Sequence, residues 1–275
     1  MKLGTKIGLA ALGAAGAWCA LLRPRRNQPG WDKLAGVKYA HRGLHNAEKG
    51  VPENSMTAFQ LAVEAGFGAE LDVHLMADGN LAVVHDSDLT RVCGKPGIIE
   101  ELMEEDLIEY PLMGTEELIP LFQEVLELFE GKTPLIIELK VEGGNANALT
   151  DAVMAMLEDW DGAYCLESFH PGVLLRLKER YPWVLRGQLS QNFLKGSEVH
   201  GLSLPARFAL TNLLTTALTG PDFVAYKWQD RGNPSLRLMR ALYGVHEVGW
   251  TVRDRQTMDA LEAEGVPAIF EGFLP

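Results

Sequence analysis

The stretch that decides the fold is residues 68–86, which read GAELDVHLMADGNLAVVHD. Two stretches with alternating apolar residues, 69–73 and 81–85, flank the pair Asp78-Gly79. An Asp-Gly pair in this setting is a strong signal for a tight hairpin. Parallel neighbouring strands need a crossover of about a dozen residues or more, which this short connection does not provide. We therefore predict that residues 81–85 return antiparallel to residues 69–73. A turn centred between Asp78 and Gly79 places His85 opposite Asp72.

Beyond residue 37 the chain alternates short β-branched runs with amphipathic helical stretches. This alternation is typical of parallel strands joined by helical crossovers. Apart from the hairpin arm, eight strands are predicted, at residues 37–41, 69–73, 134–139, 163–169, 184–189, 223–226, 248–252 and 268–270. Helices are predicted at residues 54–65, 116–129, 147–159, 172–180, 235–242 and 255–264. The pattern predicts a (β/α)8 TIM barrel with a small β-hairpin after its second strand.

Composition excludes several classes of protein. The 275 residues are 47% hydrophobic and 23% charged, which is ordinary for a globular chain. A net charge of −12 disfavours a nucleic-acid partner, because phosphate backbones bind basic surfaces. A small phosphate-bearing substrate is still compatible, since a bound metal can invert the local charge. Three scattered cysteines are too few for a disulfide scaffold or a zinc site. The oligomeric state is left open.

The N-terminus looks like a separate segment. Residues 7–22 contain no charge, whereas Lys2 and Lys6 precede this run and three arginines follow it. Sixteen helical residues span about 24 Å, against about 30 Å of bilayer core. We predict a transmembrane anchor within residues 1–26, of undetermined sidedness. One alternative is a signal peptide whose cleavage leaves a secreted protein. The other is a buried N-terminal helix. A linker at residues 27–36 would precede the barrel domain at residues 37–275, and residues 23–36 are expected to help close the barrel.

Polar residues at the predicted strand ends suggest a site, because active sites of such barrels lie at the C-terminal ends of the strands. Glu70 and Asp72 are two apart on one strand and so share a face. Together with Glu138 they can supply three converging carboxylates, which repel one another unless a cation neutralises them. Oxygen ligands suit Mg²⁺, Ca²⁺ or Mn²⁺. The alternative is that these carboxylates pair with Lys or Arg at the surface.

Two histidines and two cations complete the candidate site. His41 and His85 both lie at the predicted barrel mouth beside carboxylates, where they can act as an acid–base pair. Arg42 and Lys140 are candidate phosphate contacts, since both supply cationic donors; each could instead form a surface salt bridge. The other five histidines are expected to be structural or solvated: His45, His74, His170, His200 and His246.

Several motifs together resemble the glycerophosphodiester phosphodiesterase family. The early ones are HRG at residues 41–43, PENS at 52–55, ELDV at 70–73, DG at 78–79 and VVHD at 83–86; later ones are IELK at 137–140, SF at 168–169 and WTV at 250–252. The resemblance runs from about residue 37 to the C-terminus, and its first fifty residues are highly specific. It implies a (β/α)8 barrel that uses a divalent metal ion.

The resemblance also assigns roles to residues of this chain. It implies that Glu70, Asp72 and Glu138 bind the metal and that His41 and His85 are catalytic. It further implies that Arg42 and Lys140 contact the substrate phosphate, that Glu53 is an acid close to the site, and that Trp250 forms a wall against the glycerol moiety. Glu53 could instead be a favourable acidic residue at a helix start, and Trp250 could be simple core packing.

Two positions depart from the family pattern. Arg253 stands where the family usually has Asn, and Glu271-Gly272 stands where it usually has Thr-Asp. These changes leave the head group of the substrate open. The expected function is metal-dependent hydrolysis of glycerophosphodiesters to glycerol 3-phosphate and an alcohol. The alternatives are a lysophospholipase D and a catalytically inactive, membrane-tethered binding module. The sequence does not decide which histidine is the base, or whether water or the glycerol 2-hydroxyl is the nucleophile.

Overall fold

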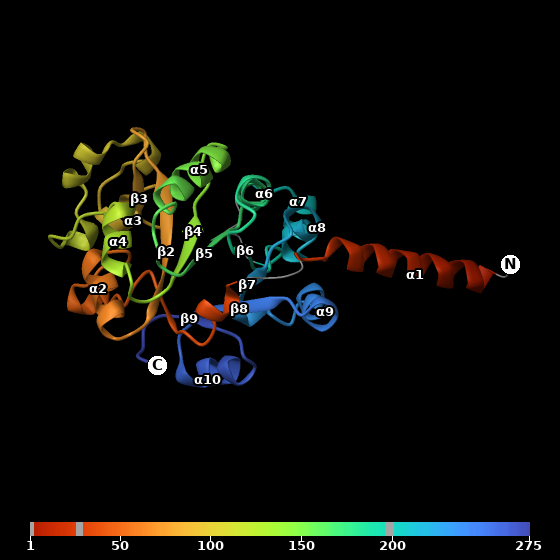
Figure 1. The fold of residues 1–275 in the computed structure, drawn as a ribbon. Coiled ribbons are helices and arrows are strands. Elements are labelled where there is room, and N and C mark those ends of the chain that lie inside the picture. Colours follow the sequence, from red (N-terminus) through yellow and green to blue (C-terminus); the bar gives the residue numbers. More distant parts are fainter. Residues whose placement is uncertain (1–2, 26–29, 196–200) are drawn as a thin grey trace.

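The computed structural model describes residues 3–25, 30–195 and 201–275, with side chains from residue 12 onward. Eight parallel strands form a closed barrel in which β1 pairs with both β9 and β2 (Figure 1). Its strands are β1 (Tyr39–His41), β2 (Gly68–Leu75), β4 (Leu135–Leu139), β5 (Tyr164–Ser168), β6 (Arg186–Ser190), β7 (Phe223–Lys227), β8 (His246–Val252) and β9 (Ala268–Phe270). The predicted (β/α)8 barrel is confirmed.

Six helices correspond to the predicted ones: α2 (Met56–Glu64), α4 (Phe122–Phe129), α5 (Ala146–Met156), α6 (Pro171–Arg180), α9 (Pro234–Tyr243) and α10 (Arg255–Ala263). The helix predicted at residues 116–129 begins only at Phe122. Pro120 disfavours a helical conformation at the residue before it, and its carbonyl instead accepts a hydrogen bond from the Val83 amide at 2.9 Å. Three further helices were not predicted: α3 (Thr90–Cys93), α7 (Leu204–Thr211) and α8 (Thr216–Thr219).

The hairpin is present, but its register differs by one residue from the prediction. Strand β3 (Leu81–Val83) runs antiparallel to β2, with Val73 opposite Val83. Met76 and Asn80 close a three-residue loop in which Gly79 has a φ of 89°, a value that glycine adopts without strain. The extra loop residue puts Val84 opposite Asp72, whose carbonyl accepts from the Val84 amide. The predicted pairing of Asp72 with His85 is therefore wrong.

A short 3-10 helix, η1 (Trp31–Lys33), covers the end of the barrel where the strands begin. Trp31 and Leu34 pack there with Tyr39 and Phe223, the first residues of β1 and β7. The Trp31 ring also stacks on His246 with 4.3 Å between ring centroids. This end of the barrel is thus filled by residues that precede the first strand. Residues 27–29 of the predicted linker lie outside the described ranges.

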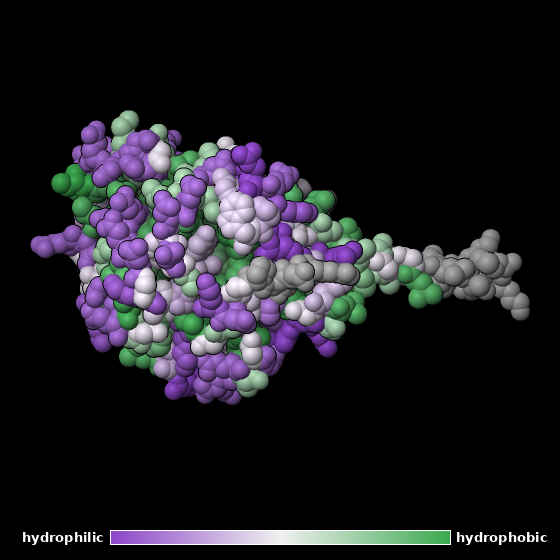
Figure 2. Space-filling view, viewed as in Figure 1, coloured by the Kyte–Doolittle hydropathy of each residue, from purple (hydrophilic) through white to green (hydrophobic). Residues whose placement is uncertain are grey.

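The N-terminal helix α1 (Leu3–Leu21) extends away from the barrel, and its C-terminal end lies against it (Figure 1). There the Trp18 indole donates to the Ser235 hydroxyl at 3.1 Å, and Leu22 is fully buried. Figure 2 shows mainly hydrophilic residues on this face of the barrel and paler to apolar ones along the described part of α1. No helix among the described residues is both long and apolar enough to cross a membrane, so the transmembrane segment predicted at residues 7–22 is not supported.

Candidate active site

Three predicted carboxylates converge where β2 and β4 lie side by side. Glu70 and Asp72 come from β2, and Glu138 of β4 is the register partner of Asp72. Each offers one oxygen, and these three oxygens lie within 4.8 Å of one another. All three side chains are buried, so solvent cannot screen their charges effectively. The strand periodicity therefore brings together the group that the sequence predicts as metal ligands.

The charge on this group is only partly balanced. Burial, together with the charges of Asp72 and Glu138, raises the pKa of Glu70 well above its usual value. Burial and the nearby Glu138 likewise raise the pKa of Glu167, which is fully enclosed at the end of β5. Protonation is one way to relieve such crowding, and a bound divalent cation is the other. Because all the donors are carboxylate oxygens, the residues fit Mg²⁺, Ca²⁺ or Mn²⁺.

Lys140 lies between two of these carboxylates. Its Nζ is 2.9 Å from Asp72 Oδ1 and 2.7 Å from Glu138 Oε1, and its side chain is mostly buried. Burial disfavours the lysine charge, but the two carboxylates outweigh burial and raise the Lys140 pKa. Burial also opposes ionisation of Asp72, yet the charges of Lys140, His85 and Arg42 hold the Asp72 pKa well below its usual value. Lys140 and Asp72 are therefore charged together at neutral pH.

Arg42 has a left-handed backbone conformation, which is unusual for any residue other than glycine. Its φ is 54°, and its amide donates to Glu70 Oε2 at 3.2 Å. Its Nε lies 3.3 Å from Asp72 Oδ2, while its Nη1 donates to Glu53 at 2.8 Å. Left-handed backbone at a non-glycine residue is costly and concentrates at functional sites. Glu53 thus reaches the site through Arg42, and it also pairs with Arg91 at 2.7 Å.

Each predicted catalytic histidine has a carboxylate on its Nδ1 atom. His41 Nδ1 lies 2.8 Å from Glu271 Oε2, and its Nε2 lies 3.9 Å from Glu70. His85 Nδ1 lies 2.6 Å from Asp86 Oδ1. A carboxylate on one ring nitrogen fixes the tautomer and the orientation of the imidazole. In both rings the Nε2 atom is therefore the one left for proton transfer.

A small cavity of about 50 Å³ connects these groups. Its lining comprises His41, Arg42, Glu70, His85, Glu138, Glu167, Phe169, Leu189, Trp250 and Ile269. Trp250 packs edge-on against Phe169, with 5.7 Å between ring centroids. Its buried Nε1–H has no hydrogen-bond partner among the described residues, so it can donate to a bound molecule. Of the predicted site residues, Asp72, Glu53 and Lys140 lie beside this lining and not in it.

Sequence reasoning did not assign the residues that support this site. Asn54 is buried, and its side-chain amide donates to Asp72 Oδ2 at 2.9 Å. Asp86 and Glu271 orient the two histidines, and Glu167 lines the cavity. Asn54 and Asp86 stand inside the motifs PENS and VVHD, and Glu167 stands at a predicted strand end. These positions are the sequence signals from which the three residues could have been identified as part of the site.

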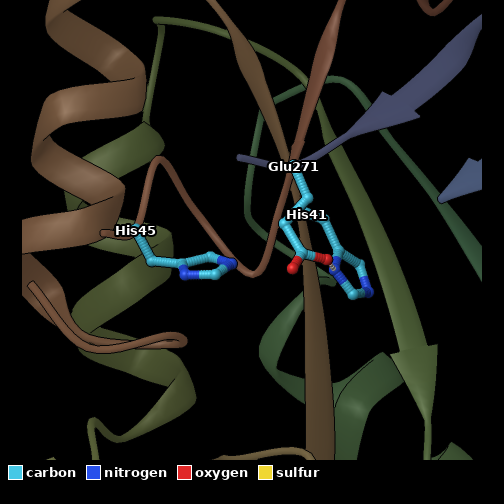
Figure 3. Close-up of side chains that lie close together, drawn as sticks. All are labelled: His41, His45 and Glu271. Carbon is cyan, nitrogen blue, oxygen red and sulfur yellow. Dashed lines mark hydrogen bonds and ion pairs between the residues drawn. The ribbon is translucent and has the colours of Figure 1, made fainter. Parts of the chain in front are cut away.

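Glu271 is also the point where the two departures from the family pattern meet. Arg253 donates to Glu271 Oε2 at 3.0 Å, so both departures belong to one ion pair beside His41. The hydrogen bond with His41 is the main reason that the pKa of Glu271 falls to about 2. Figure 3 shows the His45 ring pointing toward the same carboxylate, and ligand atoms of His41, His45 and Glu271 lie within 4.8 Å of one another.

The family described as "Glycerophosphoryl diester phosphodiesterase family" matches residues 41–273. The chain belongs to this family. The match includes every residue of the site described above and all of the barrel strands except the first two residues of β1. Membership makes the chain a hydrolase of the glycerophosphodiester phosphodiesterase type, as the motifs predicted.

Two curated relatives are similar to this chain over half of its length or more. A glycerophosphodiester phosphodiesterase of Bacillus altitudinis is 28% identical over 193 residues, which are 66% of this chain and 77% of that protein. A rat protein named lysophospholipase D GDPD1 is 33% identical over 154 residues, which are 51% of this chain and 46% of that protein.

Solved structures share the fold. An Oleispira antarctica phosphodiesterase in complex with the product sn-glycerol-3-phosphate has a TM-score of 0.69 and 22% identity, covering 86% of this chain and 93% of that one. A glycerophosphodiester phosphodiesterase from Thermotoga maritima has a TM-score of 0.64 and 24% identity, covering 85% and 94%. The barrel is therefore the fold of this family.

Proposed function

We propose that the chain hydrolyses glycerophosphodiesters to glycerol 3-phosphate and an alcohol, with a divalent metal ion and with His41 and His85 as the acid–base pair. The observation that supports this most directly is the position of the two histidines. Both line the cavity that also contains Glu70 and Glu138, and each carries a carboxylate on Nδ1. A pair of oriented imidazoles beside an all-oxygen metal site suits phosphodiester hydrolysis.

Glu70, Asp72 and Glu138 would hold the metal ion. When bound, the ion would neutralise negative charge on the phosphate and favour attack at phosphorus. Arg42 and Lys140 lie beside these carboxylates with their cationic ends buried, so they can bind the remaining phosphate oxygens. The metal ion, Arg42 and Lys140 would thus place fixed positive charge around the doubly negative phosphoryl group of the transition state.

The histidines would divide the proton transfers. One takes a proton from the nucleophile as its oxygen bonds to phosphorus, and the other gives a proton to the alcohol oxygen as its bond to phosphorus breaks. Glu271 and Asp86 keep the Nε2 atoms of the two rings toward the cavity. Trp250 and Phe169 line the cavity, and the free Trp250 Nε1–H can donate to a glycerol oxygen.

The alternatives differ in substrate or in activity. A lysophospholipase D reaction would use the same groups and would need, in addition, a place for a hydrocarbon chain. Mammalian relatives carry that name, but the rat protein is matched over less than half of its length, so its name does not decide the substrate. An inactive binding module would not need both histidines and all three carboxylates in place.

The test is release of glycerol 3-phosphate from glycerophosphocholine by the 275-residue chain, first with EDTA and then with Mg²⁺, Ca²⁺ or Mn²⁺ restored. We expect metal-dependent release, and we expect His41→Ala and His85→Ala each to lower kcat by about 10²–10⁴-fold, which is the usual contribution of a general acid or base. His246→Ala is the matched control, because His246 lies at the opposite end of the barrel against Trp31. Near-normal turnover in either catalytic-histidine variant would refute the mechanism.

A further inference from the structure

Three side chains form a second group of metal-ligating atoms, beside the carboxylate site and separate from it. Ligand atoms of His41, His45 and Glu271 lie within 4.8 Å of one another. Figure 3 shows the His45 ring pointing toward the Glu271 carboxylate, which already contacts His41. None of the three belongs to the group of carboxylates on β2 and β4. The proposed mechanism uses His41 and Glu271, but it gives no role to His45.

The backbone after β1 brings His45 back beside His41. Arg42 and Gly43 both have left-handed backbone, with φ values of 54° and 77°, so the chain turns sharply directly after His41. The Leu44 amide then donates to a backbone carbonyl of helix α2 at 2.8 Å, which fixes the loop. The two histidines are therefore close together before any ion binds, and a preformed site keeps the entropic cost of binding low.

His45 has a nitrogen atom that lacks a partner. Its Nε2 is buried and forms no hydrogen bond with any residue that the structure describes. Buried polar atoms nearly always have a partner, so an exception calls for an explanation. Burial lowers the pKa of His45, so the ring is neutral at neutral pH and one ring nitrogen has a free lone pair. A bound metal ion would give this nitrogen a partner.

The chemistry of the donors selects a different metal from that of the carboxylate site. Two imidazole nitrogens and one carboxylate oxygen suit Zn²⁺, Ni²⁺ or Cu²⁺, whereas a set of carboxylates alone suits Mg²⁺, Ca²⁺ or Mn²⁺. Two histidines and one glutamate are a ligand set that binds Zn²⁺ in other enzymes, with water in the fourth position. The low pKa of Glu271, about 2, keeps this carboxylate charged at neutral pH.

One neighbouring positive charge competes with a cation at this place. Arg253 donates to Glu271 Oε2 at 3.0 Å, and the same oxygen lies 2.8 Å from His41 Nδ1. The Arg253 side chain is 63% exposed, and exposed ion pairs are weak. The arginine can therefore turn into solvent when an ion takes its place on the carboxylate.

We propose that His41, His45 and Glu271 bind Zn²⁺ or a similar transition-metal ion, and that this ion inhibits the enzyme. An ion on His41 Nδ1 uses the lone pair of that atom, so the proton of the neutral ring moves to Nε2. The Nε2 atom then cannot accept a proton from a nucleophile, and a neutral ring is a far weaker acid than an imidazolium. His41 is thus lost to the reaction in either role. Binding of the ion does not depend on the proposed function, but the inhibition rests on it.

The first experiment measures Zn²⁺ binding by equilibrium dialysis, with Mg²⁺ at a saturating concentration to occupy the carboxylate site. We expect one Zn²⁺ ion per chain. His45→Ala and His45→Phe, the second of which keeps a ring without nitrogen, should each weaken binding by at least about 100-fold. Loss of a direct ligand should cost more than the 10–100-fold that loss of an outer-shell partner costs. Their turnover in the absence of Zn²⁺ should stay within about twofold of wild type, which shows that they fold.

Three further variants complete the dialysis. His246→Ala, at the opposite end of the barrel, and Glu138→Gln, which removes a carboxylate of the other site, should both keep the wild-type affinity for Zn²⁺. Arg253→Gln should bind Zn²⁺ more tightly, by up to about fivefold, because it removes the competing charge. Undiminished binding in the His45 variants, lost binding in Glu138→Gln, or weaker binding in Arg253→Gln would overturn the proposal.

The second experiment measures turnover of glycerophosphocholine at saturating Mg²⁺ while the concentration of free Zn²⁺ is raised with a metal buffer. We expect Zn²⁺ to lower the wild-type kcat by at least about 100-fold, since a general acid or base contributes about 10²–10⁴-fold. Half of the effect should appear at the Kd found by dialysis, and the His45 variants should keep their turnover at that concentration. Equal inhibition of those variants, or relief by excess Mg²⁺, would overturn the proposal.

The proposal and the proposed function fail in different ways. Zinc that binds through His45 without any loss of turnover refutes the inhibition, while the turnover itself supports the proposed function. Absence of turnover with every metal refutes the proposed function and with it the inhibition, and the dialysis still decides whether the zinc site exists.

Discussion

The sharpest test of the catalytic geometry is Glu271→Gln, because this change removes a charge from His41 while nearly preserving shape. The Glu271 carboxylate lies 2.8 Å from His41 Nδ1, and the pair is largely shielded from solvent. Burial lowers the pKa of His41, and the hydrogen bond to Glu271 opposes that effect. Removing the charge therefore removes the largest contribution that opposes burial, and the His41 pKa should fall further.

The size of the effect follows from the bond. A hydrogen bond to a charged group contributes about 1.5–3 kcal/mol, and one pKa unit corresponds to about 1.4 kcal/mol. We expect the limb of the kcat/KM profile that reports His41 to move about one to two units toward lower pH. We also expect kcat to fall about 10–100-fold, because a glutamine no longer fixes the tautomer in the same way. If His41 is the base, the acidic limb moves; if it is the acid, the basic limb moves.

The assay is turnover of glycerophosphocholine from pH 5 to 10 with saturating metal. Arg253→Gln is the control, because Arg253 contacts the same carboxylate from the outside and its side chain is 63% exposed. An exposed ion pair contributes about 0–1 kcal/mol, so we expect less than about a fivefold change. An unmoved profile in Glu271→Gln, or a limb that moves to higher pH, would refute the role given to Glu271.

Two further predictions concern stability. Mg²⁺ at about 100 times its Kd should stabilise the fold by about 2.7 kcal/mol and raise Tm by about 5–10 °C. Thermal unfolding with and without EDTA measures this rise, and Glu138→Gln should lose most of it. An equal rise in the variant would contradict the assignment of Glu138 as a metal ligand. Gly43→Ala should cost about 2–4 kcal/mol in urea unfolding, because a Cβ there would lie 2.8 Å from the Ala58 carbonyl carbon at a φ of 77°. Gly36→Ala, with a φ of 75° but open space, should cost about 1 kcal/mol, and equal losses would contradict the steric explanation.

The barrel could be predicted because its strands and crossovers have different periodicities, and because one hairpin explains the surplus strand. The register of that hairpin could not, since Asp78-Gly79 fits both a two-residue and a three-residue loop. Helices α7 and α8 were missed because the segment between β6 and β7 lacks a clear amphipathic stripe. Helix α7 forms part of the wall of a second cavity, of about 830 Å³, that shares His85, Glu138 and Phe169 with the catalytic one.

The candidate site could be predicted to the extent that it lies on strand ends. Glu70, Asp72 and Glu138 follow from the period of two along β2 and from the pairing of β2 with β4. Site residues that come from loops could not be placed in this way, because strand periodicity does not fix their positions. Glu271 follows the last strand, and only the closed barrel brings it to His41, which lies on the first strand.

The departure at Glu271 changes the site less than the sequence suggests. Where the family pattern has Thr-Asp, this chain has Glu-Gly, so the acidic group is kept but moves one position earlier. The longer Glu271 side chain reaches His41 Nδ1, and Arg253, the other departure, balances its charge. The two substitutions are therefore complementary: Glu271 orients the His41 ring, and Arg253 pairs with Glu271 from the exposed side. Restoring one family residue, as in Arg253→Asn, should cost less than restoring Glu271→Thr, because only the second removes the partner of His41.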